Sequence, residues 1–271
     1  MAMSPEHVTI FSFAVSYAFA LAFDLWNLFR SRLILRVLSA SLVGAGLVFQ
    51  LAYLVYQPWS LKTAAGSLLF LAFILAIFAL YGSLHHQRVA WGLFVLPLVL
   101  VLVLLAWLKV PDQAASGSYW EWLQGPRFWG MTHGILVLLA LVGVCVGFLA
   151  SVMYFVQMGR LRSKSSPLAG VKLMSLERLE AMNRRAILWA FPLLTLGLIV
   201  GLALMVHEAD GSAGWLSPKI LSALALWIVF AILLYLRYGA HVRGRRLALL
   251  TIVAFAVMMI AVLASHPGEL P

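Results

Sequence analysis

The chain has 271 residues, of which 64% are hydrophobic and only 10% are charged, and its mean hydropathy is +1.01. A soluble domain has about 45–50% apolar and about 25% charged residues, so this composition excludes a soluble globular protein. It indicates a chain that crosses a membrane several times. The single cysteine, Cys145, excludes an intramolecular disulfide and any paired-cysteine chemistry.

Eight apolar stretches are long enough to cross a membrane, because a helix needs about 20 apolar residues to span a hydrocarbon core of about 30 Å. They are expected at residues 8–29, 35–56, 64–82, 89–108, 132–156, 186–206, 219–238 and 246–264. The period-2 alternation typical of strands is absent. We therefore predict an all-α, polytopic membrane helix bundle that forms a single integral membrane domain over residues 1–271.

The basic residues are distributed unevenly between the connections. Fifteen of the 19 Lys and Arg residues follow the odd-numbered stretches, and only Lys62, Lys109, Arg127 and Lys219 lie on the other side. The positive-inside rule then places both termini on the non-cytoplasmic side of the cell (inner or plasma) membrane. This placement accounts for the net charge of +10 with the lipid bilayer as partner and no nucleic acid.

Two connections are long enough to have a structure of their own. Residues 109–131 form an aromatic-rich external loop, and residues 157–185 form a basic cytoplasmic loop. In the second, Ser175 is a good N-cap and Glu177 lies in the first turn, so a short amphipathic helix is expected to follow. Its apolar stripe and its arginines favour a helix lying on the inner leaflet; docking of a cytoplasmic partner is the alternative. The stripe consists of Leu176, Leu179 and Met182, and the arginines are Arg178, Arg184 and Arg185.

Acidic residues are scarce in the apolar stretches, where only Asp24 occurs. It lies about one turn from the cytoplasmic end, so we expect it to pair locally with Arg30 or Arg32. Ion-coupled transport usually needs several intramembrane acids, and their scarcity makes a small-molecule transporter the third choice of function.

The seven histidines fall into two layers on this topology. An external layer has His7, His133, His207 and His266, and a cytoplasmic layer has His85, His86 and His241. Each one alone suits a membrane interface and has a structural explanation. As a pair, the neutral imidazoles of His133 and His266 are what the iron of a six-coordinate haem requires. The cytoplasmic three are candidates for an inner haem site.

Tryptophans are more frequent on the external side. An aromatic belt would place them about evenly at both interfaces, so the excess favours a planar aromatic ligand there. The candidate wall residues are Trp120, Trp122 and Trp215, and Lys219 or Arg127 would hold the propionates as charge-assisted partners.

Three segments resemble the cytochrome c assembly family of membrane proteins, which includes the CcsA, CcmC and HemX-like groups. They are SLERLEAMNRRAILWAFPLLTLGLIVGLAL at 175–204, THGILVLLALVGVCVGFLASVMYFVQMGRLRSK at 132–164 and GLFVLPL at 92–98. The length and the number of helices resemble the HemX-like branch most. The resemblance runs from about residue 80 onward and is firmest over 191–201.

The resemblance implies a haem-binding function. His133 matches the family's external haem-ligand histidine, and His266 corresponds to a second one. Where haem-handling members have a WGxxWxWDPKE loop, this chain has HEADGSAGWLSPK at 207–219, which retains Trp215, Pro218 and Lys219. Arg237 replaces a further family histidine, and His241 lies one turn beyond it.

The predicted function is therefore a haem-handling membrane protein for cytochrome c maturation or for regulation of haem supply. It would supply ligands and orientation, possess no catalytic residue of its own, and work with other cytochrome c assembly subunits. The alternative is a non-catalytic subunit or scaffold that keeps the fold without the haem chemistry.

Overall fold

A computed structural model gives the fold and describes residues 9–29, 33–56, 64–85, 90–109, 126–162, 173–208, 218–238 and 244–264. Every regular element within these ranges is a helix. The eight helices are α1 (Ile10–Phe29), α2 (Leu33–Tyr56), α3 (Ala64–His85), α4 (Trp91–Leu108), α5 (Pro126–Arg162), α6 (Leu176–Glu208), α7 (Pro218–Tyr238) and α8 (Arg245–Ala264). The predicted all-α fold is confirmed.

Seven of these helices are long and apolar enough to cross a membrane. The eighth, α7, has a shorter apolar segment among its described residues, Ile220–Leu236. Both α5 and α7 begin with a proline, which suits the first helical position because that residue needs no N–H partner. The chain is thus a multi-pass membrane protein.

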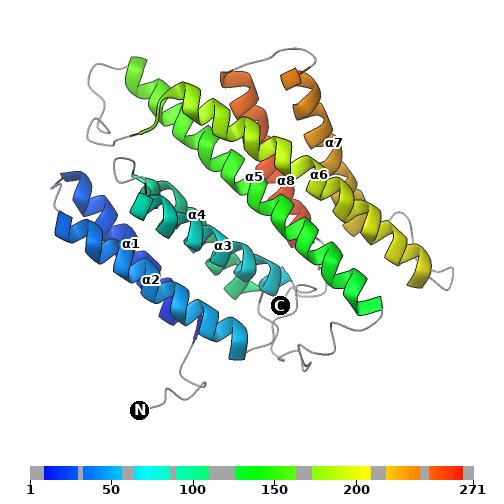
Figure 1. The fold of residues 1–271 in the computed structure, drawn as a ribbon, viewed down its shortest axis with the longest axis horizontal. Coiled ribbons are helices and arrows are strands. Elements are labelled where there is room, and N and C mark those ends of the chain that lie inside the picture. Colours follow the sequence, from blue (N-terminus) through cyan, green and yellow to red (C-terminus); the bar gives the residue numbers. More distant parts are fainter. Residues whose placement is uncertain are drawn as a thin grey trace. The chain divides into compact units, whose positions relative to one another are not determined.

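The chain divides into two compact units. One consists of residues 1–116 with 159–174 and contains α1–α4; the other consists of residues 117–158 with 175–271 and contains α5–α8 except for the last residues of α5. Figure 1 shows that helices adjacent in sequence run antiparallel within each unit.

In the first unit the helices form a closed ring of contacts, because α1 packs on α2 and α4, and α3 packs on α2 and α4. A buried hydrogen-bonded chain joins three of them: the Tyr17 hydroxyl donates to Gln50 Oε1 at 2.7 Å, and Gln50 Nε2 donates to the Leu69 carbonyl at 3.1 Å. The Tyr17 ring lies directly against Gly46, where a Cβ atom would come within 2.6 Å of it. The small residue therefore lets α1 and α2 approach closely.

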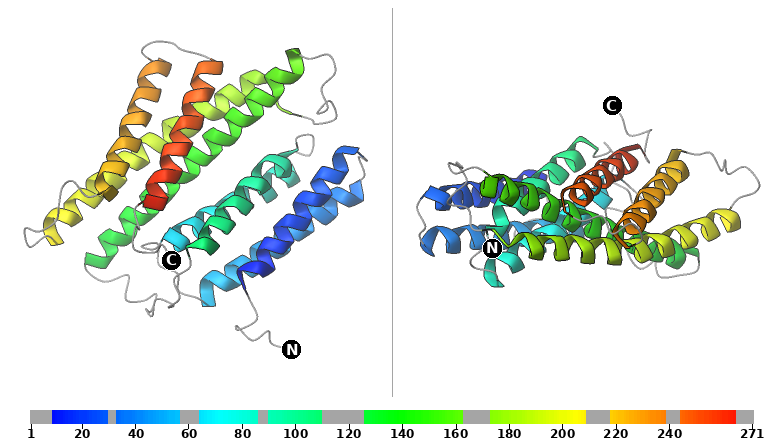
Figure 2. Two further views of the ribbon diagram at one scale, coloured as in Figure 1. Left: turned by 180° about the vertical axis from the view of Figure 1, so that it is seen from behind. Right: turned by 90° about the horizontal axis from the view of Figure 1, so that it is seen from above.

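The second unit also forms a closed ring. Helices α7 and α8 lie side by side, as Figure 2 shows from behind, and α6 packs on α7. The Phe148 and Phe255 rings stack at 4.0 Å between α5 and α8. Gly143 of α5 lies against Ala190 of α6, which closes the ring.

Helices α5 and α6 extend well beyond the predicted stretches, to 37 and 33 residues. At a rise of about 1.5 Å per residue they are about 55 and 50 Å long, against a hydrocarbon core of about 30 Å. Residues 157–162 and 176–185, expected in a loop, belong to these helices. Their side chains are mostly good helix formers, so the helices continue where the apolar character ends.

The amphipathic helix expected after Ser175 is therefore not a separate interfacial helix but the first turns of α6. Its beginning is as predicted, since Ser175 Oγ accepts a hydrogen bond from the Arg178 backbone N–H at 3.4 Å. Of its apolar stripe, Leu179 is 0% exposed, whereas Leu176 and Met182 are half-buried. Leu179 therefore packs on protein rather than on lipid, and a periodic pattern alone cannot distinguish these two environments.

Candidate functional site

His133 lies in the third turn of α5 and packs against α6. Its Nδ1 atom is 2.7 Å from the carbonyl oxygen of Gly197, and the ring is half-buried. A carbonyl oxygen can only accept a hydrogen bond, so Nδ1 must carry the proton in the neutral ring. The Nε2 atom then has a free lone pair, which is the state in which histidine binds metals.

Two glycines on α6 allow the close approach of α5: Gly201 lies against the imidazole, and Gly197 lies against Val137. A Cβ atom at Gly201 would lie 2.7 Å from Cε1 and 2.8 Å from Nδ1 of His133, and one at Gly197 would lie 2.9 Å from Val137. The position of the candidate ligand thus depends on Gly197 and Gly201, two residues that the sequence analysis did not include in the candidate site. Their G-x-x-x-G spacing is the signal that pointed to a close approach.

Aromatic side chains lie one turn before His133. Trp129 is four residues earlier on α5 and therefore on the same helix face, and both it and Phe128 are exposed. Their rings are 5.8 Å apart in an edge-to-face arrangement. This end of α5 thus combines an imidazole with exposed aromatic surface.

The inner candidate His85 has a different environment. It ends α3, is exposed, and stacks on the Tyr81 ring at 4.2 Å, with Nδ1 3.3 Å from the Tyr81 carbonyl oxygen. A one-turn contact of this kind is a sufficient structural explanation for the residue.

The other predicted site residues are not brought together by the described part of the chain. His86, Trp120, Trp122, Trp215, His241 and His266 lie outside the described residues, as does His7. Arg127, His207 and Lys219 lie in helices α5, α6 and α7, but their side chains are not described. Within the described ranges, no group of three or more His, Cys, Asp or Glu side chains is arranged to hold a metal ion.

Comparison with known proteins identifies the family. A family model described as "Cytochrome C assembly protein" matches residues 61–268. The chain belongs to this family.

Curated family members that resemble the chain are cytochrome c biogenesis proteins. It is 29% identical over 217 residues to the CcsA protein of Prochlorococcus marinus (strain MIT 9301), covering 73% of this chain and 69% of that protein. It is 29% identical over 213 residues to CcsA of Guillardia theta, covering 73% and 70% of the two chains. No solved structure matches it. These similarities support a membrane function in cytochrome c assembly for this chain.

The family match begins after α2, so it covers α3–α8 and includes His133, Gly197 and Gly201. Helices α1 and α2 precede it. The intramembrane acid Asp24 therefore lies outside the family's matched region.

Asp24 connects helices of the first unit. Its carboxylate lies beside Ser39 and near the charge of Arg36, both on α2, and packs directly on Gly92 of α4. Arg36 in turn donates to the Ser83 carbonyl of α3 at 2.9 Å. The predicted partners Arg30 and Arg32 lie outside the described residues, and the described charge near Asp24 is Arg36.

A polar network in the family-matched region joins three helices of the second unit. Asn183 of α6 donates from Nδ2 to the Gly147 carbonyl at 3.2 Å and to Ser151 Oγ at 2.7 Å on α5. The same amide is 3.2 Å from Thr251 Oγ1 on α8. Asn183 is only 4% exposed, and this network satisfies its buried polar atoms.

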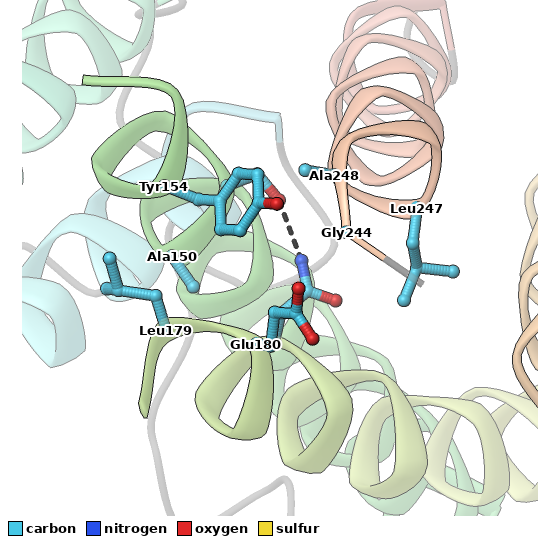
Figure 3. A pocket seen from close by; sticks show the side chains of 9 residues that line it. Ala150, Tyr154, Leu179, Glu180, Gly244, Leu247 and Ala248 are labelled. Atoms are coloured by element: carbon cyan, nitrogen blue, oxygen red, sulfur yellow. Dashed lines mark hydrogen bonds between the residues drawn. The ribbon is translucent and has the colours of Figure 1, made fainter. Parts of the chain in front are cut away.

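Next to the network is a small cavity, shown in Figure 3 with Glu180 and Tyr154 facing Gly244. Gly244 precedes α8 and has φ of +71°. A Cβ atom there would lie 2.9 Å from the Tyr154 hydroxyl and 3.5 Å from Glu180 Oε1. Glycine is required by the backbone conformation and by the close approach of these two side chains.

Proposed function

We propose that this family member handles haem near its external face, for cytochrome c maturation or for regulation of haem supply, and that it is closest to the HemX-like branch. His133 is the proposed external ligand, and His266 is its proposed partner. We also propose that the protein lies in the inner or plasma membrane as one integral domain, with both termini on the non-cytoplasmic side. Its charge distribution supports this orientation.

The observation that carries the proposal is the hydrogen bond from His133 Nδ1 to the Gly197 carbonyl. Metal-ligating histidines almost always donate their other ring N–H to a carbonyl or a carboxylate, which fixes the tautomer and the ring plane. Here the bond leaves Nε2 as the coordinating atom. The half-buried ring and the exposed Trp129 one turn away suit a planar ligand with an apolar face.

The remaining proposed site residues complete this arrangement. Trp120, Trp122 and Trp215 would cover the porphyrin, Lys219 or Arg127 would bind the propionates, and His207 lies at the same end of the protein. When bound, haem supplies the iron chemistry, and the chain supplies ligands and orientation. His85, His86 and His241 form the proposed inner site.

An absorption spectrum of the detergent-purified protein, with and without added haem, tests the proposal. We expect a Soret band that weakens in the His133→Ala, His266→Ala double variant, because both proposed external ligands are then missing and only the proposed inner site remains. His85→Ala is the reciprocal variant, since this exposed histidine belongs to the proposed inner site, and it should keep the external contribution to the band. A Soret band that is unaffected by loss of both external histidines refutes the ligand assignment.

A second candidate function has a specific observation in its favour. The segment HEADGSAGWLSPK at 207–219 lacks most of the tryptophans and the acid of the loop found in haem-handling members. This departure favours a scaffold or non-catalytic subunit that retains the fold. Purification with a stoichiometric partner and a spectrum without haem would support this second function over the first.

A further inference from the structure

Four exposed arginines gather at the end of the second unit where α6 and α8 begin. Arg184 and Arg185 belong to α6, and Arg245 and Arg246 begin α8; all four are exposed. The two helices meet at this level, because Glu180 of α6 lies against Gly244, the residue before Arg245 (Figure 3). Arg184 is one helical turn from Glu180 on the same face. We call these four residues the arginine surface.

Aromatic side chains mark the depth of this surface in the membrane. Trp189 lies one turn after Arg185 and is 69% exposed. Tyr235 and Tyr238 end α7, at the same end of the unit, and they are 70% and 48% exposed. Exposed Trp and Tyr side chains of membrane proteins occupy the headgroup region. The arginine surface therefore lies at the level of the lipid phosphates.

The length of the apolar part of α6 indicates the same depth for Arg184 and Arg185. Residues 186–206 form a segment of about 32 Å at 1.5 Å per residue, which matches a hydrocarbon core of about 30 Å. Its exposed side chains beyond Trp189 are apolar, including Leu196 and Ile199. Arg184 and Arg185 immediately precede this segment, so they lie just outside the hydrocarbon.

We propose that the arginine surface binds the phosphate groups of anionic phospholipids. Guanidinium groups bind phosphate oxygens through paired hydrogen bonds, and these four lie at phosphate depth on two adjoining helices. A lipid fits better than an acidic protein, because the flanking Trp189, Tyr235 and Tyr238 side chains suit the junction of headgroup and acyl chain. The proposal does not depend on haem binding.

The test compares lipid retention by native mass spectrometry after purification in mixed micelles of detergent with phosphatidylglycerol or phosphatidylcholine. The wild-type protein should retain phosphatidylglycerol in preference to phosphatidylcholine. Each arginine near a membrane surface contributes about fivefold to binding of anionic lipid. Replacing all four by Gln should therefore abolish the preference, and replacing them by Lys should keep part of it.

Arg178→Gln is the matched control. Arg178 is also an exposed arginine of α6, but it lies six residues, or about 9 Å, farther from the hydrocarbon than Arg184. This variant should keep the preference within about twofold. If the variant with all four arginines replaced by Gln does not fold, the single variants Arg184→Gln and Arg245→Gln can be used. Each should lower the preference for phosphatidylglycerol about fivefold.

Three outcomes would overturn the proposal. Wild-type protein that retains both lipids equally has no such site, and Gln variants that keep the full preference place the lipid elsewhere. Inorganic phosphate that competes fully with phosphatidylglycerol identifies a free-anion site. Loss of the Soret band bears only on the proposed function, whereas lipid retention bears only on the arginine surface, so their failures are distinguishable.

Discussion

The Gly201→Ala substitution tests directly whether the close contact with Gly201 positions the His133 imidazole. The added methyl group would lie 2.7 Å from Cε1 and 2.8 Å from Nδ1 of the imidazole, whereas ordinary carbon contacts are about 3.5–4.0 Å. The ring must retreat by roughly 0.8–1 Å. The 2.7 Å bond from Nδ1 to the Gly197 carbonyl would then lengthen to about 3.5 Å, where a hydrogen bond is lost.

The expected cost follows from two contributions. A lost hydrogen bond is worth about 1 kcal/mol, and overpacking a close contact costs about 1–3 kcal/mol. Gly201→Ala should therefore lower the free energy of unfolding in detergent by about 2–4 kcal/mol. Gly130→Ala is the control on α5, because a Cβ atom there meets nothing within 4 Å, and it should be close to neutral.

A double-mutant cycle with His133→Ala assigns this cost to the imidazole. In the His133→Ala background the methyl group at residue 201 meets no ring, so Gly201→Ala should cost little. The two changes should then be non-additive by about 2–4 kcal/mol. Additivity within about 0.5 kcal/mol would show that Gly201 acts elsewhere and would refute the reasoning. The cycle needs no haem, so it tests the geometry independently of the proposed function.

Two further predictions concern the buried polar chains and the glycine contacts. Asn183→Leu should lower the unfolding free energy by about 1–2 kcal/mol, because it removes hydrogen bonds to two neighbouring helices; an unchanged thermal denaturation curve would contradict this. Gly46→Ala should cost about 1–3 kcal/mol, because its Cβ would come within 2.6 Å of the Tyr17 ring. Gly44→Ala, two residues earlier with nothing within 4 Å, is its control in the same assay and should be neutral or stabilising, since Ala favours a helix.

The sequence was sufficient to predict the helices because each span is a continuous apolar run. The prediction of helix boundaries failed where a helix continues beyond its apolar stretch, as at the start of α6. There the stripe containing Leu179 was interpreted as a lipid-facing surface, although Leu179 itself is buried. An amphipathic pattern specifies an apolar neighbour but does not say whether that neighbour is lipid or protein.

The candidate site was predictable only in part for a related reason. His133 could be selected from residue type, position and family resemblance. Its relation to Gly197 and Gly201 joins residues more than 60 positions apart, and only the packing of α5 on α6 brings them together. The G-x-x-x-G spacing of the two glycines is typical of close helix packing, but nothing in this spacing specifies which side chain of the neighbouring helix packs against them.

The network around Asn183 has a consequence for biosynthesis. Its partners come from α5, which precedes α6, and from α8, which is made after α6. Until α8 has inserted, Asn183 has only its α5 partners, Gly147 and Ser151, and its Oδ1 atom lacks the Thr251 hydroxyl that lies 3.4 Å away in the finished fold. Unsatisfied polar groups are costly inside a bilayer, so arrival of α8 closes the second unit as a late step of assembly. A chain stopped before residue 244 would therefore be a natural target for membrane quality control.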